Sequence, residues 1–429
     1  MFRWWNSLAQ SLPGAPPGPD AVLAGRAGTL TPRAARGIAA SGPARILLRQ
    51  GAVEEVTVEK SFDLIVIGHG IVGLAHALAA ARAGHRVAVL DRDAQPNGAS
   101  VRNFGFVTVT GQGWPHTWRR ARRARGVWAG VAEEAGIPVL QRGLLMAARR
   151  PEALAVIEEF AAGPMGEGCR ILRAHEIPAP LAPDLLGALH SPHELRVESR
   201  EALPRLRAWL AERHGVAIFP QCAALAVETG AVHTPQGRFT APHIVVCPGT
   251  DLTSLFPEAF AARGTTLCKL HMLRLAAPGW RLPAPVMSDL GLHRYRGYHG
   301  APSLPALRAR LEVEQKPQLE NGVHLIVVQS ADGSLVVGDS HHYAATPDPF
   351  QPEAVDALIL EEFAAVLGAP PPVTERWIGI YPSGAEDAFF EAPMPGVRLV
   401  SVTSGTGAST AFGLAEEVLA DLMQMEFPA

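Results

Sequence analysis

Short apolar runs alternate with a helical stretch soon after residue 60. The run LIVI at residues 64–67 is uninterrupted and β-branched, which is typical of a strand buried on both faces. Residues 74–83 are rich in Ala and Leu and are followed by Gly84, as expected for a packed helix and its end. A second apolar run at residues 86–90 ends at Asp91. This order predicts a strand–helix–strand unit with parallel strands.

A second group of apolar runs predicts a sheet of another kind. Residues 266–275, 324–329 and 334–338 have the length and composition of strands. The pair Asp332-Gly333 separates the last two runs and is a strong signal for a hairpin turn. We therefore expect an antiparallel sheet in this part of the chain.

The first 60 residues differ from the rest. They are rich in Pro, Gly, Ala and Arg and lack clear periodic runs. We expect residues 1–60 to form a flexible N-terminal extension, with an organelle transit peptide as the alternative. No apolar run of about 20 residues occurs, so no membrane-spanning helix is predicted.

Composition excludes several classes of protein. Among 429 residues, 38 Lys+Arg face 41 Asp+Glu, so no cationic field exists to hold nucleic acid or an anionic membrane. The four cysteines lie far apart without a C-x-x-C pair, which disfavours a disulfide framework and a zinc site and favours a cytoplasmic setting. His341 and His342 are adjacent and would face opposite ways on a strand, with no acidic or cysteine ligand at suitable spacing. We expect no metal.

The run GHGIVG, which starts at Gly68, lies between the first strand and the helix. Gly68 permits a tight turn, Gly70 lets a diphosphate approach the backbone, and Gly73 allows the helix to pack on the strand. The helix N-terminus offers free N–H groups to the diphosphate. Asp91 lies about 20 residues further on, where a carboxylate accepts hydrogen bonds from a ribose 2′-hydroxyl. Asp91 disfavours a phosphorylated ribose, although Arg92 lies beside it, and the unit predicts a dinucleotide site.

The loop after the second strand distinguishes FAD from NAD. It reads NGASVRNFG at residues 97–105, and its small residues and polar donors suit a chain laid along a diphosphate and a flavin edge. An ordinary Gly/Ser loop is the alternative. A strand at residues 397–402, a glycine-rich turn and an amphipathic helix at 411–423 end the chain. The N-terminus of that helix could stabilise negative charge on a reduced flavin.

These motifs together resemble the glycine oxidase/D-amino-acid oxidase superfamily of FAD-dependent amine oxidoreductases. Further matches in the family's order are PHIVVCPG at 242–249, RWIGIYP at 376–382, PGVRLV at 395–400 and SGTGAS at 404–409. The resemblance covers residues 62–429. It implies FAD, held noncovalently because Asn103 replaces an attachment histidine and the C-terminal motif has no cysteine.

The resemblance also implies a fold of the mixed α/β and α+β class, D-amino-acid oxidase-like, with a Rossmann-like FAD-binding domain and a discontinuous antiparallel-sheet substrate domain. The FAD-binding domain would combine residues 61–110, 190–262 and 372–429, and the substrate domain 111–189 and 263–371. The expected cofactor-binding residues are Gly68, Gly70, Ile71, Val72, Gly73, Asp91, Arg92, Ala99, Ser100, Arg102, Asn103, Gly105, Gly249, Gly405, Thr406, Gly407, Ala408 and Ser409.

The chain departs from the family pattern where the substrate would bind. Relatives that oxidise glycine or D-amino acids hold the carboxylate with an arginine two residues after the Gly of the Trp-x-Gly motif, and that position is Tyr381 here. A second arginine, expected near Gly405, is also absent. This departure disfavours a simple α-amino acid.

Other cationic and polar groups could hold an anion. Lys269 and His271 lie on one face of a predicted strand that, by the resemblance, faces the flavin, and the segment HRYRGYH at 293–299 contains further candidates. GHGIVG, GASVRNFG and CKLHMLR together resemble the subgroup of this superfamily that acts in phosphonate catabolism. The expected catalytic residues are Lys269, for O2 reduction or anion binding, and Tyr381; the expected substrate-binding residues are His271, Arg294, Arg296 and Tyr298.

The resemblance implies oxidation of a small amine. Hydride would pass from the carbon next to nitrogen to flavin N5, the imine would hydrolyse to aldehyde and amine, and O2 would reoxidise the flavin, giving H2O2. The expected substrate is 2-aminoethylphosphonate or an N-methylated relative. A glycine, sarcosine or D-amino-acid oxidase with a rearranged carboxylate site, and a non-catalytic flavin-binding protein, are the alternatives; an NAD-dependent dehydrogenase is less favoured. The oligomeric state stays open.

Overall fold

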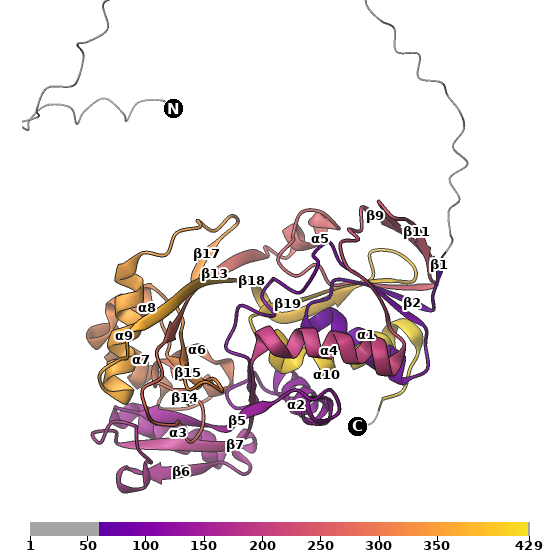
Figure 1. Ribbon diagram of the computed structural model, residues 1–429. Coiled ribbons are helices and arrows are strands. Elements are labelled where there is room, and N and C mark those ends of the chain that lie inside the picture. The colour runs from indigo at the N-terminus through magenta and orange to yellow at the C-terminus, as the bar shows by residue number, and fades with distance from the viewer. Residues whose placement is uncertain (1–59, 428–429) are drawn as a thin grey trace, which may run out of the picture. The chain divides into compact units, whose positions relative to one another are not determined.

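The structure, a computed structural model, describes residues 60–427, and these form part of one compact unit (Figure 1). The extension expected at residues 1–60 therefore lies outside the described residues apart from Lys60. Within residues 60–427, no helix is long and apolar enough to cross a membrane.

One large sheet contains most of the described strands. Its first part is parallel and is built on β2 (Leu64–Ile67), the strand predicted from the run LIVI. On one side β2 pairs with β3 (Val87–Leu90), which pairs with β8 (Ala217–Phe219). On the other side it pairs with β12 (His243–Val246), which pairs with β19 (Val397–Ser404). This is the parallel arrangement predicted for the dinucleotide-binding half.

The second part of the sheet is mainly antiparallel and confirms the second predicted sheet. The long strand β18 (Val373–Glu391) joins the two parts, since it pairs with β19 on one side and with β13 (Thr266–Leu275) on the other. The order then continues through β16 (Leu335–Gly338), β15 (Ile326–Gln329), β14 (Val286–Met287), β5 (Val139–Ala148), β7 (Gly187–Val197) and β4 (Phe106–Val107), with β17 (His342–Ala344) on β13 and β6 (Arg170–Arg173) on β7. The division into two domains stays a prediction, and its boundary at residue 190 falls inside β7.

The parallel strands are buried on both faces, which explains their uninterrupted apolar sequence. Leu64 and Val66 of β2 pack with helices, whereas Ile65 and Ile67 pack in a separate cluster with Phe239 on the opposite face. The helices are α1 (Ile71–Arg82), α2 (His116–Glu134), α4 (Ser199–His214) and α10 (Gly407–Met423), of which α1, α4 and α10 lie together in Figure 1. The opposite face is covered by α5 (Pro257–Ala262) and a small sheet of β1 (Lys60–Ser61), β11 (Gly237–Thr240), β10 (Ala231–Thr234) and β9 (Ala226–Glu228).

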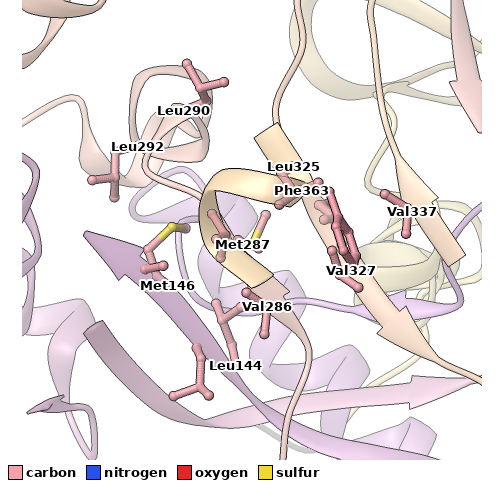
Figure 2. Packing of buried hydrophobic residues seen from close by; sticks show 14 of the residues in the cluster. Leu144, Met146, Val286, Met287, Leu290, Leu292, Leu325, Val327, Val337 and Phe363 are labelled. Atoms are coloured by element: carbon pink, nitrogen blue, oxygen red, sulfur yellow. The ribbon is translucent and has the colours of Figure 1, made fainter. Parts of the chain in front are cut away.

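The antiparallel half has its own buried core. Figure 2 shows part of it, in which Val327 lies near Phe363, while Met146 and Val286 lie on neighbouring strands. Apolar side chains of this kind, fully removed from water, are the main stabilising contribution to such a fold. The helices of this half are α3 (Pro151–Ala162), α6 (Leu290–Arg294), α7 (Leu304–Glu314), α8 (Lys316–Glu320) and α9 (Glu353–Leu367), with 3₁₀ turns at Pro164–Gly166, Ala174–Glu176 and Arg296–Tyr298.

The predicted hairpin at Asp332-Gly333 is present between β15 and β16. These strands are antiparallel, Gly333 has a φ of 90°, and the Ser334 N–H donates to the Asp332 carboxylate at 2.9 Å. A positive φ is readily adopted by Gly, so the residue type fits the turn. The first and last helices begin earlier than predicted, at Ile71 and Gly407, because the glycine-rich segments form their first turns.

Candidate active site

The glycine-rich segment brings α1 close to β2. Gly68 has a φ of 105°, a backbone conformation that suits glycine, and a side chain there would overlap the Cys247 carbonyl oxygen of β12's following loop. A side chain at Gly73 would overlap the carbonyl oxygen of Gly68. These two glycines therefore allow helix and strand to approach each other, as the sequence predicts.

The first turn of α1 lines a cavity. Gly70 is the N-cap, and no side chain caps the helix from that position. A Cβ at Gly70 would meet only the Ser100 hydroxyl, at 3.0 Å, and that hydroxyl accepts a hydrogen bond from the Ile71 N–H at 2.9 Å. A helix N-terminus with exposed N–H groups and a partial positive charge stabilises a diphosphate.

Asp91 lies directly after β3, beside the glycine-rich segment. Its carboxylate accepts hydrogen bonds from the His69 N–H and the Asp93 N–H, each at 2.7 Å. Burial lowers the pKa of His69, so Asp91 faces a neutral imidazole at neutral pH. Its neighbour Arg92 forms an ion pair with Asp251 at 2.7 Å. Ribose binding by Asp91 stays a prediction.

A second helix begins at the same cavity. The N-cap of α10 is Thr406, again without a capping side chain, and its hydroxyl lies 2.8 Å from the Ser404 hydroxyl. The Ser409 hydroxyl accepts a hydrogen bond from the Thr108 N–H at 2.8 Å, which ties this turn to the opposite wall. Two helix N-termini, those of α1 and α10, therefore line one cavity of about 450 Å³.

The lining of the cavity combines helix N-termini with apolar side chains. The two helix N-termini suit a diphosphate, and apolar walls at Phe104, Phe106 and Leu270 suit an aromatic ring. The residues therefore fit FAD. Of the predicted cofactor-binding residues, the cavity is lined by Gly70, Ile71, Val72, Gly73, Ala99, Ser100, Arg102, Asn103, Gly249, Gly405, Thr406, Gly407, Ala408 and Ser409.

Four predicted cofactor-binding residues do not line the cavity: Gly68, Asp91, Arg92 and Gly105. Gly68 and Gly105 have a packing role, because a side chain at Gly105 would overlap the Val197 carbonyl oxygen. Arg92 is engaged by its ion pair, and Asp91 lies at the end of β3 beyond the cavity wall.

The loop at residues 99–105 is held by the Asn103 side chain. Its amide nitrogen donates to the Ala99 carbonyl at 2.7 Å, while its oxygen accepts from the Gly105 N–H at 2.7 Å and the Ser199 hydroxyl at 2.8 Å. Arg102 donates to the Asn97 carbonyl at 2.8 Å. The loop is thus fixed by internal hydrogen bonds along one wall of the cavity.

Arg294, at the end of α6, faces the cavity from the antiparallel half. Its guanidinium donates to the hydroxyl of Tyr381 at 3.0 Å and to that of Tyr343 at 3.3 Å. Burial would lower the pKa of Arg294, but Tyr381, Tyr343 and Asp339 together raise it, so the side chain is always charged. Burial also raises the pKa of Tyr381 well above its ordinary value, which keeps that hydroxyl neutral.

Arg296 also lines the cavity but is already paired. Its guanidinium lies 3.1 Å from the Asp387 carboxylate and donates to the Ala385 carbonyl at 2.8 Å. In contrast, no carboxylate among residues 60–427 lies within ion-pair distance of Arg294. Among the described residues that line the cavity, Arg294 and Arg102 are the arginines without a carboxylate partner, and Arg102 donates to the Asn97 carbonyl instead.

The prediction that Lys269 and His271 face the cavity is wrong. Both lie on one face of β13, as alternation predicts, but Leu270 from the other face lines the cavity. The Lys269 ammonium binds the Asp348 carboxylate at 2.7 Å, and the His271 ring bonds to Asp356 of α9 at 3.0 Å. The face that carries them is covered by α9 and its preceding loop, so neither side chain reaches the cavity.

Tyr298 does not line the cavity either, contrary to prediction. Its ring is 1% exposed, packs on Phe160 with 4.8 Å between ring centroids, and lies close to Gly111. Burial raises the pKa of Tyr298 well above its ordinary value. The 3₁₀ turn at Arg296–Tyr298 directs Arg296 outward and Tyr298 into the core.

The sequence analysis missed a buried polar cluster at the cavity. The side chains of His324, Asp339 and His341 offer ligand atoms that all lie within 4.8 Å of one another. His341 lines the cavity and His342 does not, as expected for adjacent residues. The expectation that no acidic ligand lies at suitable spacing from these histidines is wrong, since Asp339 precedes His341 by two residues and pairs with His324 across the hairpin. The predicted turn at Asp332-Gly333 was the available signal, because residues equidistant from a hairpin turn lie opposite each other.

Comparison with solved structures shows the same fold in several oxidoreductases. Glycine oxidase from Bacillus cereus matches with 18% identity over 85% of this chain and 96% of that chain, with a TM-score of 0.67. L-proline dehydrogenase from P. horikoshii matches with 17% identity over 85% of this chain and 94% of that chain, with a TM-score of 0.68. L-α-glycerophosphate oxidase from Mycoplasma pneumoniae, with FAD bound, matches with 13% identity over 86% of this chain and 96% of that chain, with a TM-score of 0.64. No curated protein matches the chain.

The family comparison agrees with the geometry of the cavity. The family described as FAD dependent oxidoreductase (DAO) matches residues 63–422, which include both uncapped helix N-termini and the loop at 99–105. The match covers most of the chain, and the chain therefore belongs to this family of FAD-dependent oxidoreductases.

Proposed function

We propose that this enzyme oxidises a small amine that carries a compact, strongly anionic group, with 2-aminoethylphosphonate or an N-methylated relative as the substrate. The observation that carries the proposal is Arg294, a permanently charged cavity residue without a carboxylate partner among the described residues. An unpaired arginine in a partly closed cavity is costly unless a ligand supplies the counter-charge.

The surroundings of Arg294 favour a phosphonate over a simple carboxylate. Two tyrosine hydroxyls, from Tyr343 and Tyr381, lie at its guanidinium, and burial keeps the pKa of Tyr381 well above its ordinary value. A tetrahedral dianion has three oxygens, so it can accept from the guanidinium fork and from both hydroxyls at once. Tyr381 occupies the position at which the family's amino-acid oxidases carry an arginine, which favours a substrate without an α-carboxylate.

The rest of the cavity would position the amine and exclude water. Phe104, Phe106 and Leu270 line the cavity and provide apolar walls. Binding the anion at Arg294 fixes one end of the substrate and limits where its amine-bearing carbon lies. FAD, when bound, supplies the two-electron oxidation, and reoxidation by O2 with release of H2O2 stays a prediction.

Anaerobic reduction of the flavin tests this proposal. Protein reconstituted with FAD is mixed with 2-aminoethylphosphonate, N-methyl-2-aminoethylphosphonate, glycine, sarcosine or n-propylamine, and bleaching of the flavin absorbance is followed. We expect fast bleaching with the two phosphonates only, and peroxide after O2 is admitted. Bleaching by glycine or sarcosine alone would favour an amino-acid oxidase, whereas no bleaching by any amine would favour a non-catalytic flavin-binding protein.

A further inference from the structure

The cluster of His324, Asp339 and His341 lies at the cavity wall close to Arg294. His324 precedes β15, Asp339 follows β16, and their backbones pair across the hairpin, with N···O distances of 3.1 and 3.0 Å. The three residues are 3%, 4% and 6% exposed, yet all three line the cavity. A cluster of polar groups that is buried from solvent but open to a ligand cavity is placed to meet a ligand.

The hydrogen bonds within the cluster leave acceptors without donors. The His341 Nδ1–H donates to the Gly322 carbonyl at 2.8 Å, which leaves its Nε2 as an acceptor 3.9 Å from the Asp339 Oδ2. Asp339 Oδ1 and both ring nitrogens of His324 are buried and make no hydrogen bond, although His324 Nδ1 lies 2.9 Å from Asp339 Oδ1. Neutral His324 has one N–H and one acceptor nitrogen, so a ligand with several N–H donors would satisfy that acceptor nitrogen, the Asp339 oxygen and His341 Nε2.

The charges of the cluster favour a monocation. Burial alone would raise the pKa of Asp339, but His324, His341 and Arg294 outweigh it and lower the pKa, so the carboxylate is ionised. Burial and the charge of Arg294 hold the pKa of His341 well below its ordinary value, so His341 is neutral. Tyr295, whose ring lies 5.6 Å from that of His324, has a raised pKa and is neutral too. Arg294 and Asp339 thus provide one positive and one negative pole in the same cavity.

We propose that Asp339, His324 and His341 form the subsite for the amino group of the substrate, and that His324 accepts a proton from it. This inference rests on the proposed function, because it requires an amine whose anionic end binds Arg294. Asp339 receives the ammonium group and His341 Nε2 accepts a second N–H. One N–H bond then breaks, its proton forms a new bond to a ring nitrogen of His324, and the electron pair stays on the amine nitrogen. The neutral amine is the form from which a hydride can leave the adjacent carbon.

His324 is the better proton acceptor of the two histidines. His341 is committed through Nδ1 to the Gly322 carbonyl, whereas both nitrogens of His324 lack hydrogen bonds. Protonated His324 would also lie against the Asp339 carboxylate, which stabilises the charge that it gains. Two histidines and a carboxylate are a donor set that divalent zinc binds as well, but the adjacent Arg294 opposes a dication.

The test is the pH profile of anaerobic flavin reduction by 2-aminoethylphosphonate in the FAD-loaded enzyme. In the wild type the rate should reach its plateau near neutral pH. In His324→Gln the rate at pH 7 should fall about 100-fold, the usual contribution of a general base. The rate of this variant should recover at about pH 10, where a free amine loses its proton without a base from the protein. Asp339→Asn should raise the apparent substrate Kd tenfold or more.

The neighbouring His342 provides a matched control. Its ring lies near His271, 5.7 Å between centroids, on the side of the strand that does not line the cavity. His342→Gln should leave the profile unchanged, and FAD content and thermal unfolding of each variant check that it folds. If His324→Gln does not fold, His341→Gln is used, and its substrate Kd should rise as an accepting atom is displaced.

The outcomes separate this inference from the proposed function. If the wild type is reduced but His324→Gln keeps the wild-type pH profile, the proton-acceptor role is wrong while the proposed function stands. If no anionic amine reduces the wild type, both are wrong. If purified wild type contains one equivalent of zinc that Asp339→Asn lacks, and chelation of zinc abolishes flavin reduction, the cluster is a metal site and the amine subsite is wrong.

Discussion

Replacing Arg294 by methionine removes the positive pole of the cavity while keeping a side chain of similar length. In the proposed complex, the guanidinium donates two charge-assisted hydrogen bonds to the phosphonate. Each contributes about 1.5–3 kcal/mol, so their loss amounts to about 3–6 kcal/mol. We therefore expect kcat/KM for 2-aminoethylphosphonate to fall about 10²–10⁴-fold, since about 1.4 kcal/mol corresponds to tenfold. Arg294→Lys keeps the positive charge but loses the planar guanidinium, so its kcat/KM should lie between those of the wild type and Arg294→Met.

The assay is steady-state oxidation of 2-aminoethylphosphonate compared with n-propylamine, which has no anionic group. Arg294→Met should leave the already low kcat/KM for n-propylamine unchanged or slightly raised. Arg296→Met is the matched control, because Arg296 lines the same cavity but is paired with Asp387 at 3.1 Å. An equal loss for both amines in Arg294→Met, or a larger loss in Arg296→Met, would refute anion binding by Arg294.

Three further predictions concern the cofactor, the stability and a residue outside the cavity. Gly73→Ala should destabilise the protein by about 1–3 kcal/mol and weaken FAD binding, because the new Cβ would overlap the Gly68 carbonyl oxygen. A Cβ at Gly98 would have no atom within 4 Å, so Gly98→Ala should change neither the unfolding temperature nor the Kd for FAD. Burial alone would raise the pKa of Asp356, but hydrogen bonds, including that from His271, lower this pKa overall. The ionised carboxylate therefore stabilises the fold above about pH 4, and this contribution is lost as the pH falls below that value. Asp356→Asn should lower the free energy of unfolding by about 3 kcal/mol at pH 7. If urea unfolding shows the same stability difference between wild type and variant below pH 4 as at pH 7, this assignment is wrong. Lys269 does not line the cavity, so Lys269→Met should not slow flavin reoxidation by O2 in stopped-flow experiments. A large decrease in the reoxidation rate would show that Lys269 does promote O2 reduction.

The sequence predicts the framework of the fold well where local patterns determine it. β2 and β13 begin and end at the residues that their apolar runs indicate. Gly70 to Gly73 and most of the loop at 99–105 line the cavity, because their placement depends on backbone conformation that glycine and small residues specify locally. These features need no knowledge of which distant segments come together.

The substrate side of the cavity was harder to predict. Alternation correctly places Lys269 and His271 on one face of β13, but it does not say which face another element covers. The ion pair of His271 with Asp356, 85 residues later, decides this, and it depends on the packing of α9. His324 was missed for the same reason, since its surroundings depend on how the hairpin of β15 and β16 packs near Tyr295, the residue after α6.

The measurement that tests the account most directly is a crystal structure of the reduced, FAD-loaded enzyme with 2-aminoethylphosphonate, in which turnover cannot occur. The account predicts phosphonate oxygens within hydrogen-bonding distance of the Arg294 guanidinium, and the amine nitrogen at the Asp339 carboxylate. It further predicts FAD with its diphosphate at the N-terminus of α1. A substrate bound in the reverse orientation, or away from both side chains, would contradict the assignment of the two poles.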